Sequence, residues 1–339
     1  MNYRFLVLFL LSLLMVGGAA AQQACDLPVD VVGIEKGEKS GGIIRGLQAG
    51  DLVVTVNKSE HVPIDSLTYD AAPRRIVLVI DNTHALPSDA RKAEAQVATY
   101  ILEHARTMDS FALITARGAD REVKFDQGRD AVMEAVRDLS GDPKGKSSNL
   151  GVLDAVEQGI DWLGSSKPGD SILLLAMDSE GNRKTNAKKI AQELEDHHIR
   201  LFTIAFGFVN LGNSVKARQT MTSTGLGVAE PLVGSLLYEN GEQNLSPLTL
   251  NSGGYLFMQN ALDPRKEFKL IEKLPKLQQV AMQFYQIMAE FYHMKLTLPA
   301  HEANWTVDLS GAAQQKWTPI WSVYPQAVNS CAGQLSASK

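Results

Sequence analysis

Residues 74–85 read Arg-Arg-Ile-Val-Leu-Val-Ile-Asp-Asn-Thr-His-Ala, in which an uninterrupted apolar run ends in a carboxylate. An apolar run that is continuous rather than alternating is typical of a strand buried on both faces of a parallel sheet. Three later runs share this pattern, namely Phe111–Thr115, Ile172–Met177 and Leu201–Ala205. We therefore expect four strands of one mostly parallel sheet.

Segments with the apolar spacing of helices separate these strands. The positions that form the three apolar stripes are Ala93, Val97, Tyr100, Ile101 and Met108; Leu153, Val156, Ile160 and Leu163; and Ala187, Ile190, Ala191 and Leu194. Alternating strands and helices predict the α/β class, with a doubly wound, mostly parallel, Rossmann-like sheet and helices on both of its faces.

The two ends of the chain differ from this core. Residues 26–70 lack a helical stripe and contain alternating pieces such as Leu52–Val56, which favours a small β unit. After the core, an amphipathic helix is predicted to begin near Pro275, with apolar positions at Leu277, Ala281, Phe284, Met288 and Phe291, and strand-like pieces follow at His293–Leu298, Trp305–Leu309 and Ile320–Tyr324. We predict a β-rich segment at 22–73, the α/β domain at 74–262, and a helix with a β-rich segment at 263–339.

The first residues have the order of a secretory signal peptide. Arg4 precedes the apolar run Phe5–Val16, and small residues follow as far as Ala21, where we expect cleavage. The alternatives are a retained membrane anchor and a lipidated Cys25. Export would place the protein in the periplasm or outside the cell. The formal net charge of −5 gives no sign of the basic face that nucleic-acid binding requires, and no later segment is apolar enough to span a membrane.

The chain has two cysteines, Cys25 and Cys331, one near each end. Because exported proteins meet oxidising conditions, we expect a disulfide between them, with two free thiols as the alternative. Neither cysteine has a histidine or a second cysteine at the spacing of a zinc site.

Hydroxyl and carboxylate side chains follow three of the predicted elements at the carboxyl edge of the sheet. Asp81 and Thr83 follow the first strand, Ser148 precedes the second helical stripe, and Asp178 follows the strand Ile172–Met177. Oxygen ligands without histidine or cysteine suit a hard cation, Mg²⁺ or Mn²⁺. For both aspartates the alternative is a carboxylate that caps the following helix.

The order and spacing of these residues resemble the von Willebrand factor type A (VWFA) domain and its metal-ion-dependent adhesion site. The resemblance covers roughly Arg74–Leu262 and implies that Asp81, Thr83, Ser148 and Asp178 are metal ligands. The fifth position of the family motif is Ala85, whose methyl group cannot bind a cation, so we expect weak metal binding. His84 occupies a variable position of that motif, and we expect it to face solvent.

The flanking segments are similar to the secreted bacterial VWFA-related proteins typical of acidobacteria. That similarity rests on Val29–Val32, on Gly46–Leu52 and on Ser252–Gly254. Members of the family are mostly binding modules, so the resemblance implies adhesion or scaffolding without catalysis, and a partner whose acidic side chain completes the coordination of the cation. The Gly-rich and Asn-rich excursion Phe208–Pro247 leaves the same edge, where we expect it to contact the partner.

Three other functions remain open. The segment Gly141–Ser147 is similar to the phosphate-binding loop of nucleotide hydrolases, but Arg129–Leu139 before it is patterned as a helix where that loop requires a strand. A different hydrolase is the second alternative, although neither G-x-S-x-G nor H-E-x-x-H occurs in the sequence. The third is a structural domain whose acidic loops only cap helices.

Overall fold

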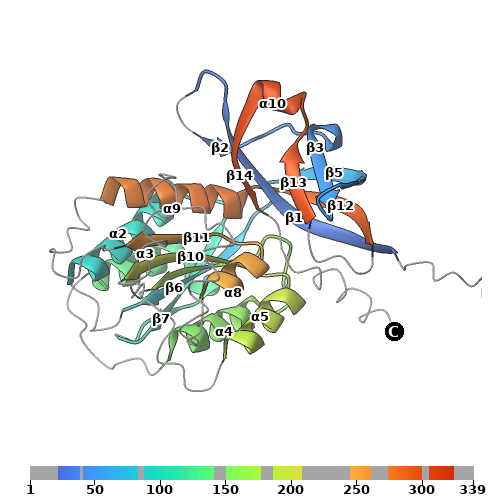
Figure 1. Cartoon of the computed structure of the whole chain (residues 1–339). Coiled ribbons are helices and arrows are strands. Elements are labelled where there is room, and N and C mark those ends of the chain that lie inside the picture. The colour runs from blue at the N-terminus through green and yellow to red at the C-terminus, as the bar shows by residue number, and fades with distance from the viewer. Residues whose placement is uncertain are drawn as a thin grey trace, which may run out of the picture.

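The structure, a computed structural model, describes residues 22–38, 41–82, 88–118, 120–140, 150–176, 186–207, 245–260, 274–299 and 305–323. The predicted signal peptide at 1–21 lies outside these residues. Figure 1 shows two parts, a helix-covered sheet and a smaller module of strands.

The larger part is a six-stranded sheet in the order β11-β10-β9-β6-β7-β8. Its strands are β6 (Arg75–Asp81), β7 (Ser110–Ala116), β8 (Glu122–Val123), β9 (Ser171–Ala176), β10 (Arg200–Gly207) and β11 (Leu256–Asn260). All neighbouring pairs are parallel except β7 with β8. The predicted α/β class and the parallel strands are confirmed.

Helices cover both faces of this sheet (Figure 1). One face packs against α2 (Ser88–His104), α3 (Gly128–Asp138) and α9 (Leu274–Ala289), and the other against α4 (Val152–Leu163), α5 (Ala187–Asp196) and α8 (Leu245–Asn251). A short 3-10 helix, η2 (Phe125–Gln127), precedes α3. Side chains alternate along a strand, so Ile76 and Leu78 of β6 enter one core and Val77 enters the other. This arrangement explains why the run had no polar alternation.

The smaller part, which we call the β module, is built from both ends of the chain. It contains β1 (Gln22–Glu35), β2 (Gly42–Ile43), η1 (Ala49–Asp51), β3 (Leu52–Val56), β4 (Glu60–Val62), β5 (Ile64–Asp70), β12 (Phe291–Pro299), β13 (Trp305–Leu309), α10 (Ala313–Lys316) and β14 (Trp317–Val323). One sheet has the order β14-β1-β12-β5, with β2 against β1, and the other has the order β13-β3-β4. Blue and red strands therefore lie side by side in Figure 1.

Several local expectations need correction. Met108 lies beyond the end of α2 and is 46% exposed, because the chain turns after His104 to enter β7. Phe291 is the first residue of β12 rather than part of the preceding helix, although it is buried as the apolar stripe required. The predicted excursion Phe208–Pro247 ends earlier than expected, since α8 begins at Leu245, and residues 208–244 lie outside the described residues. Strands β8 and β11 had not been predicted, because both are short strands at the edges of the sheet.

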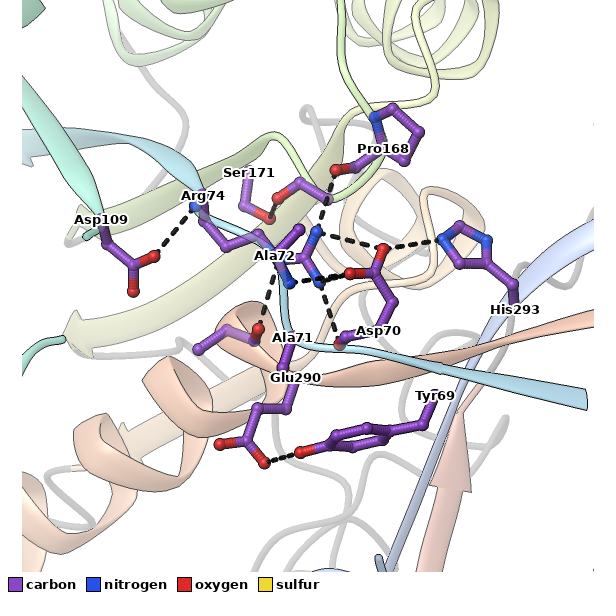
Figure 2. Close-up of polar contacts among 12 residues, drawn as sticks. Tyr69, Asp70, Ala71, Ala72, Arg74, Asp109, Pro168, Ser171, Glu290 and His293 are labelled. Carbon is purple, nitrogen blue, oxygen red and sulfur yellow. Dashed lines mark hydrogen bonds and ion pairs between the residues drawn. The ribbon is translucent and has the colours of Figure 1, made fainter. Parts of the chain in front are cut away.

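The β module meets the larger part at the amino edge of the six-stranded sheet. Arg74, immediately before β6, has a buried guanidinium that donates to the carbonyl oxygens of Ala289 at 3.2 Å and Pro168 at 3.1 Å. The same group forms an ion pair with Asp70 at 2.9 Å (Figure 2). Figure 2 also shows that Asp70 accepts a contact from His293 of β12.

A second buried arginine completes this contact, which we call the module junction (Asp30, Asp70, Arg74, Arg200 and Phe291). Arg200, the first residue of β10, forms an ion pair with Asp30 of β1 and donates to the carbonyl oxygen of Gly253 at 2.9 Å. The guanidinium groups of Arg74 and Arg200 lie 4.5 Å and 5.2 Å from the centre of the Phe291 ring. The β module is therefore fixed to the amino edge.

Candidate functional site

The carboxyl edge of the six-stranded sheet lies at the other end of the strands from the module junction. Strand β6 lies between β7 and β9, with Asp81 opposite Ala116 and Ile80 opposite Leu175. The ends of these three strands therefore meet around Asp81. In open α/β sheets this edge is where ligands bind.

Asp81 is fully buried, and both of its carboxylate oxygens contact one arginine. The Nε of Arg117 donates to Oδ1 at 3.0 Å, and Nη2 contacts Oδ2. The side chain of Arg117 is 17% exposed. Two parallel hydrogen bonds between a guanidinium and a carboxylate form the strongest common ion pair in proteins, and this geometry also fixes the orientation of both groups.

The turn after β7 places Arg117 in this position. Its backbone has φ 43°, which is uncommon for a residue with a side chain, and its amide donates to the carbonyl oxygen of Leu150 at 3.1 Å. The next residue, Gly118, packs so closely that a Cβ would lie 1.9 Å from the carbonyl oxygen of Asn82. The turn therefore requires glycine and lies directly on the end of β6.

Two further buried polar groups lie at this edge. Neither carboxylate oxygen of Glu94, on α2, has a hydrogen-bond partner among the described residues, and the residue is 1% exposed. The Nδ2 of Asn82 also lacks one within the same part of the chain. Burial raises the pKa of the Glu94 carboxyl well above its usual range, and the charge of Asp81 raises it further. The positive charges of Arg117 and Arg91 oppose this shift.

Of the predicted metal ligands, the structure describes only Asp81, which ends β6 as expected. Thr83, Ser148 and Asp178, with the Ala85 position, lie outside the described residues. Their neighbours along the chain do meet at this edge: Asn82 follows Asp81, Ala176 ends β9, and Leu150 accepts from the amide of Arg117. Convergence of the predicted positions is therefore compatible with the backbone.

Sequence reasoning did not find Arg117, Glu94 or Asn82. Arg117 comes two residues after the predicted strand Phe111–Thr115, at the same edge as Asp81, and that position was a usable signal. Glu94 lies beside Ala93 on the apolar stripe of a predicted helix, where a carboxylate is conspicuous. Neither signal reveals a contact, because the order of strands in a sheet is not visible in one sequence.

Of the predicted ligands for Mg²⁺ or Mn²⁺, only Asp81 lies among the described residues, and its carboxylate is engaged by Arg117. Oxygen ligands of the predicted kind suit these ions chemically. The carboxylate at the centre of the predicted set, however, already holds a guanidinium with both oxygens. Within the described ranges, no group of three or more His, Cys, Asp or Glu is placed to hold a metal ion.

Cys25, the other described member of the predicted site residues, belongs to the β module. It is buried in the core of that module and is not a free thiol. Cys331 lies outside the described residues, so the pairing of these two cysteines stays a prediction. No helix in the part of the chain that the structure describes is long and apolar enough to cross a membrane.

Neither a protein-family model nor a curated protein matches this sequence. Among solved structures, the chain is similar to proximal thread matrix protein 1 from the mussel byssus, with 12% identity over 69% of this chain and 50% of that protein, at a TM-score of 0.39. A second structure of that protein, with a zinc-occupied metal-ion-dependent adhesion site motif, gives 13% identity over 67% of this chain and 49% of that one, at a TM-score of 0.40. The chain spans about half the length of these proteins, and likeness at this level assigns no function.

Proposed function

We propose that this chain is an exported, non-catalytic protein-binding module whose binding surface is the carboxyl edge of the six-stranded sheet. The observation that carries the proposal is the polar cluster at that edge, in which buried Asp81, Asn82 and Glu94 lie with partly buried Arg117. Buried charged groups destabilise a fold unless they are fully paired, and unpartnered ones gather at functional sites more often than elsewhere.

The position of the β module supports the same edge. The module junction occupies the amino edge of the sheet through Arg74 and Arg200. The proposed binding surface lies at the other end of the same strands. Strand β10 ends there at Gly207, and the chain returns at Leu245, so the predicted partner-contacting segment begins at this edge. Loops on a rigid sheet are where binding residues concentrate.

Several finer features belong to this proposal. We propose that residues 1–21 are a signal peptide, that the protein is secreted or periplasmic, and that the domain limits are 22–73, 74–262 and 263–339. We further propose membership of the VWFA-related family and the disulfide between Cys25 and Cys331. The pattern of the amino-terminal residues and the VWFA-like motif support these features. Mass spectrometry of exported protein without reductant tests the disulfide, and two alkylatable thiols would contradict it.

Weak binding of Mg²⁺ or Mn²⁺ by Asp81, Thr83, Ser148 and Asp178 stays a prediction. Such an ion would have to share the carboxylate of Asp81 with Arg117 or displace it. The partner that completes the coordination of the ion through an acidic side chain is an expectation of the same kind. We therefore base the binding surface on the buried cluster and on the connection after β10.

A binding experiment with a matched loop control tests the proposal. Mature protein is used to capture partners from the envelope and secreted fractions of the source organism, and the affinity of each captured protein is then measured by calorimetry. Replacing residues 210–242 with a Gly/Ser linker should weaken this affinity at least about tenfold, which is roughly 1.4 kcal/mol of binding free energy.

The control variant changes a loop of the β module instead. Asn57 and Lys58 both have positive φ, 51° and 69°, so glycine at both positions should preserve the turn between β3 and β4. This variant should bind with wild-type affinity. Equal affinity of the linker variant and wild type, with both proteins folded, would place the binding surface elsewhere.

A further inference from the structure

We infer that Arg117 is the built-in cation of the carboxyl edge, and that this edge therefore keeps Asp81 neutralised without a divalent metal ion. The inference concerns the state of Asp81 and does not rest on the proposed binding function. It opposes the prediction from the sequence, which assigned the same carboxylate to Mg²⁺ or Mn²⁺.

The geometry of the ion pair is the first argument. A metal ion binds a carboxylate oxygen at about 2.0–2.2 Å and needs a lone pair directed at it. Arg117 engages both oxygens of Asp81, one through Nε at 3.0 Å and the other through Nη2. A guanidinium stays charged throughout the pH range in which proteins function, so this counter-charge is permanent.

The backbone of the turn is the second argument. Arg117 adopts φ 43°, and its amide is held by Leu150. Gly118 leaves no room for a Cβ against Asn82, while the amide of Asn82 donates to Ala116 at 2.9 Å. These contacts join the ends of β6 and β7 and hold the arginine beside Asp81. The position of the cation is therefore specified by the fold and is not an accident of a flexible side chain.

The surrounding charges are the third argument. The charges of Asp81, Arg117 and Arg91 all act on Glu94. Arg117 is paired directly with Asp81, so positive charge is already present at this edge. A divalent ion added to this cluster would meet positive charge with little water to screen it. Removing Arg117 should favour binding of a divalent ion, because it leaves the buried acids Asp81 and Glu94 with one positive charge fewer.

The test compares wild type with Arg117→Gly, in which the side chain is lost and the positive φ of the turn is preserved. Thermal unfolding is measured at increasing Mn²⁺, with Mn²⁺ binding followed by electron paramagnetic resonance. Wild type should show the same Tm with Mn²⁺ and with chelator, and no bound Mn²⁺. The Arg117→Gly variant should bind Mn²⁺, and its Tm should rise by a few degrees once Mn²⁺ exceeds the Kd about tenfold.

Two control variants show whether the carboxylate of Asp81 is the Mn²⁺ ligand, and they keep the test decisive if Arg117→Gly does not fold. Adding Asp81→Asn to Arg117→Gly should abolish the gained Mn²⁺ binding, because the carboxylate is the proposed ligand. If Arg117→Gly does not fold, wild type and Asp81→Asn alone decide the matter. Mn²⁺ binding by wild type that is lost in Asp81→Asn would overturn the inference. A folded Arg117→Gly variant that responds to Mn²⁺ no more than wild type would also overturn it.

Discussion

The two edges of the six-stranded sheet both bury charged side chains, but they satisfy them to different degrees. At the amino edge, Arg74 donates to carbonyl oxygens, pairs with Asp70 and stacks on Phe291. Arg200 pairs there with Asp30, of which only Oδ1 has no hydrogen-bond partner among the described residues. At the carboxyl edge, Asp81 and Arg117 pair well, while Glu94 and Asn82 keep polar atoms without partners among the described residues.

This difference separates a structural role from a functional one. A buried cation whose donors are all used joins two parts of a fold, and its removal leaves several acceptors unsatisfied. Unpartnered buried groups do not stabilise a fold, and proteins keep such local conflicts mainly at functional sites. We therefore interpret the module junction as a structural contact that holds the β module on the sheet. The carboxyl edge is the binding surface that we propose.

The largest expected effect is at the module junction. Arg74→Met should lower the free energy of unfolding by about 3–5 kcal/mol. The substitution leaves Asp70 without its ion-pair partner and leaves the carbonyl oxygens that accept from the guanidinium without a donor. Urea unfolding followed by circular dichroism measures the change. The matched control is Arg137→Met, whose exposed pair with Glu103 should contribute less than about 1 kcal/mol. Similar losses of unfolding free energy in both variants would contradict the structural role of the junction.

The second effect is the pH dependence of the same junction. Burial raises the pKa of Asp30 to about 7 from 3.8, although the charge of Arg200 opposes the shift. Between these values the folded state keeps a proton that the unfolded state has lost, so this contribution to stability is complete below about pH 4 and is lost as pH rises through about 7. The loss is at most about 4 kcal/mol.

The comparison of wild type with Asp30→Asn isolates this contribution. Tyr255 also faces Asp30, but burial raises its pKa well above 10, so it stays protonated throughout this range. Unfolding free energies measured from pH 4 to pH 8 should fall more steeply in wild type than in Asp30→Asn. Parallel curves would show that Asp30 is ionised in the fold throughout, and the junction would then be fully paired.

The smallest effect, and the one of opposite sign, is at the carboxyl edge. Glu94→Met should raise the free energy of unfolding by about 1 kcal/mol, since it replaces a buried carboxyl without a partner by an apolar side chain of similar length. Differential scanning calorimetry detects this as a higher Tm. A clear loss of stability would show that Glu94 supports the fold, and the contrast between the two edges would disappear.

Most secondary structure in the described residues could be predicted because periodicity reflects burial directly. The run at Ile76–Ile80 lies within β6, and the stripe Leu153–Leu163 lies in α4, because each pattern is set by what the neighbouring layer buries. The predictions failed where a strand was short, or where an apolar pattern continued from one helix or strand into the next. Phe291 continues the stripe of α9 but begins β12, since helix and strand bury the same face of the chain there.

The sequence by itself determined that an α/β sheet is present and that Asp81 stands at the end of one of its strands. Only the tertiary structure decided what Asp81 touches. Strand β7 follows β6 as its parallel neighbour, with Ala116 opposite Asp81, and the next residue is Arg117. The tertiary structure likewise joined the two ends of the chain into one β module through β1 and β12. Patterns along a chain report burial, whereas contacts between distant segments depend on strand order and register, which local patterns do not encode.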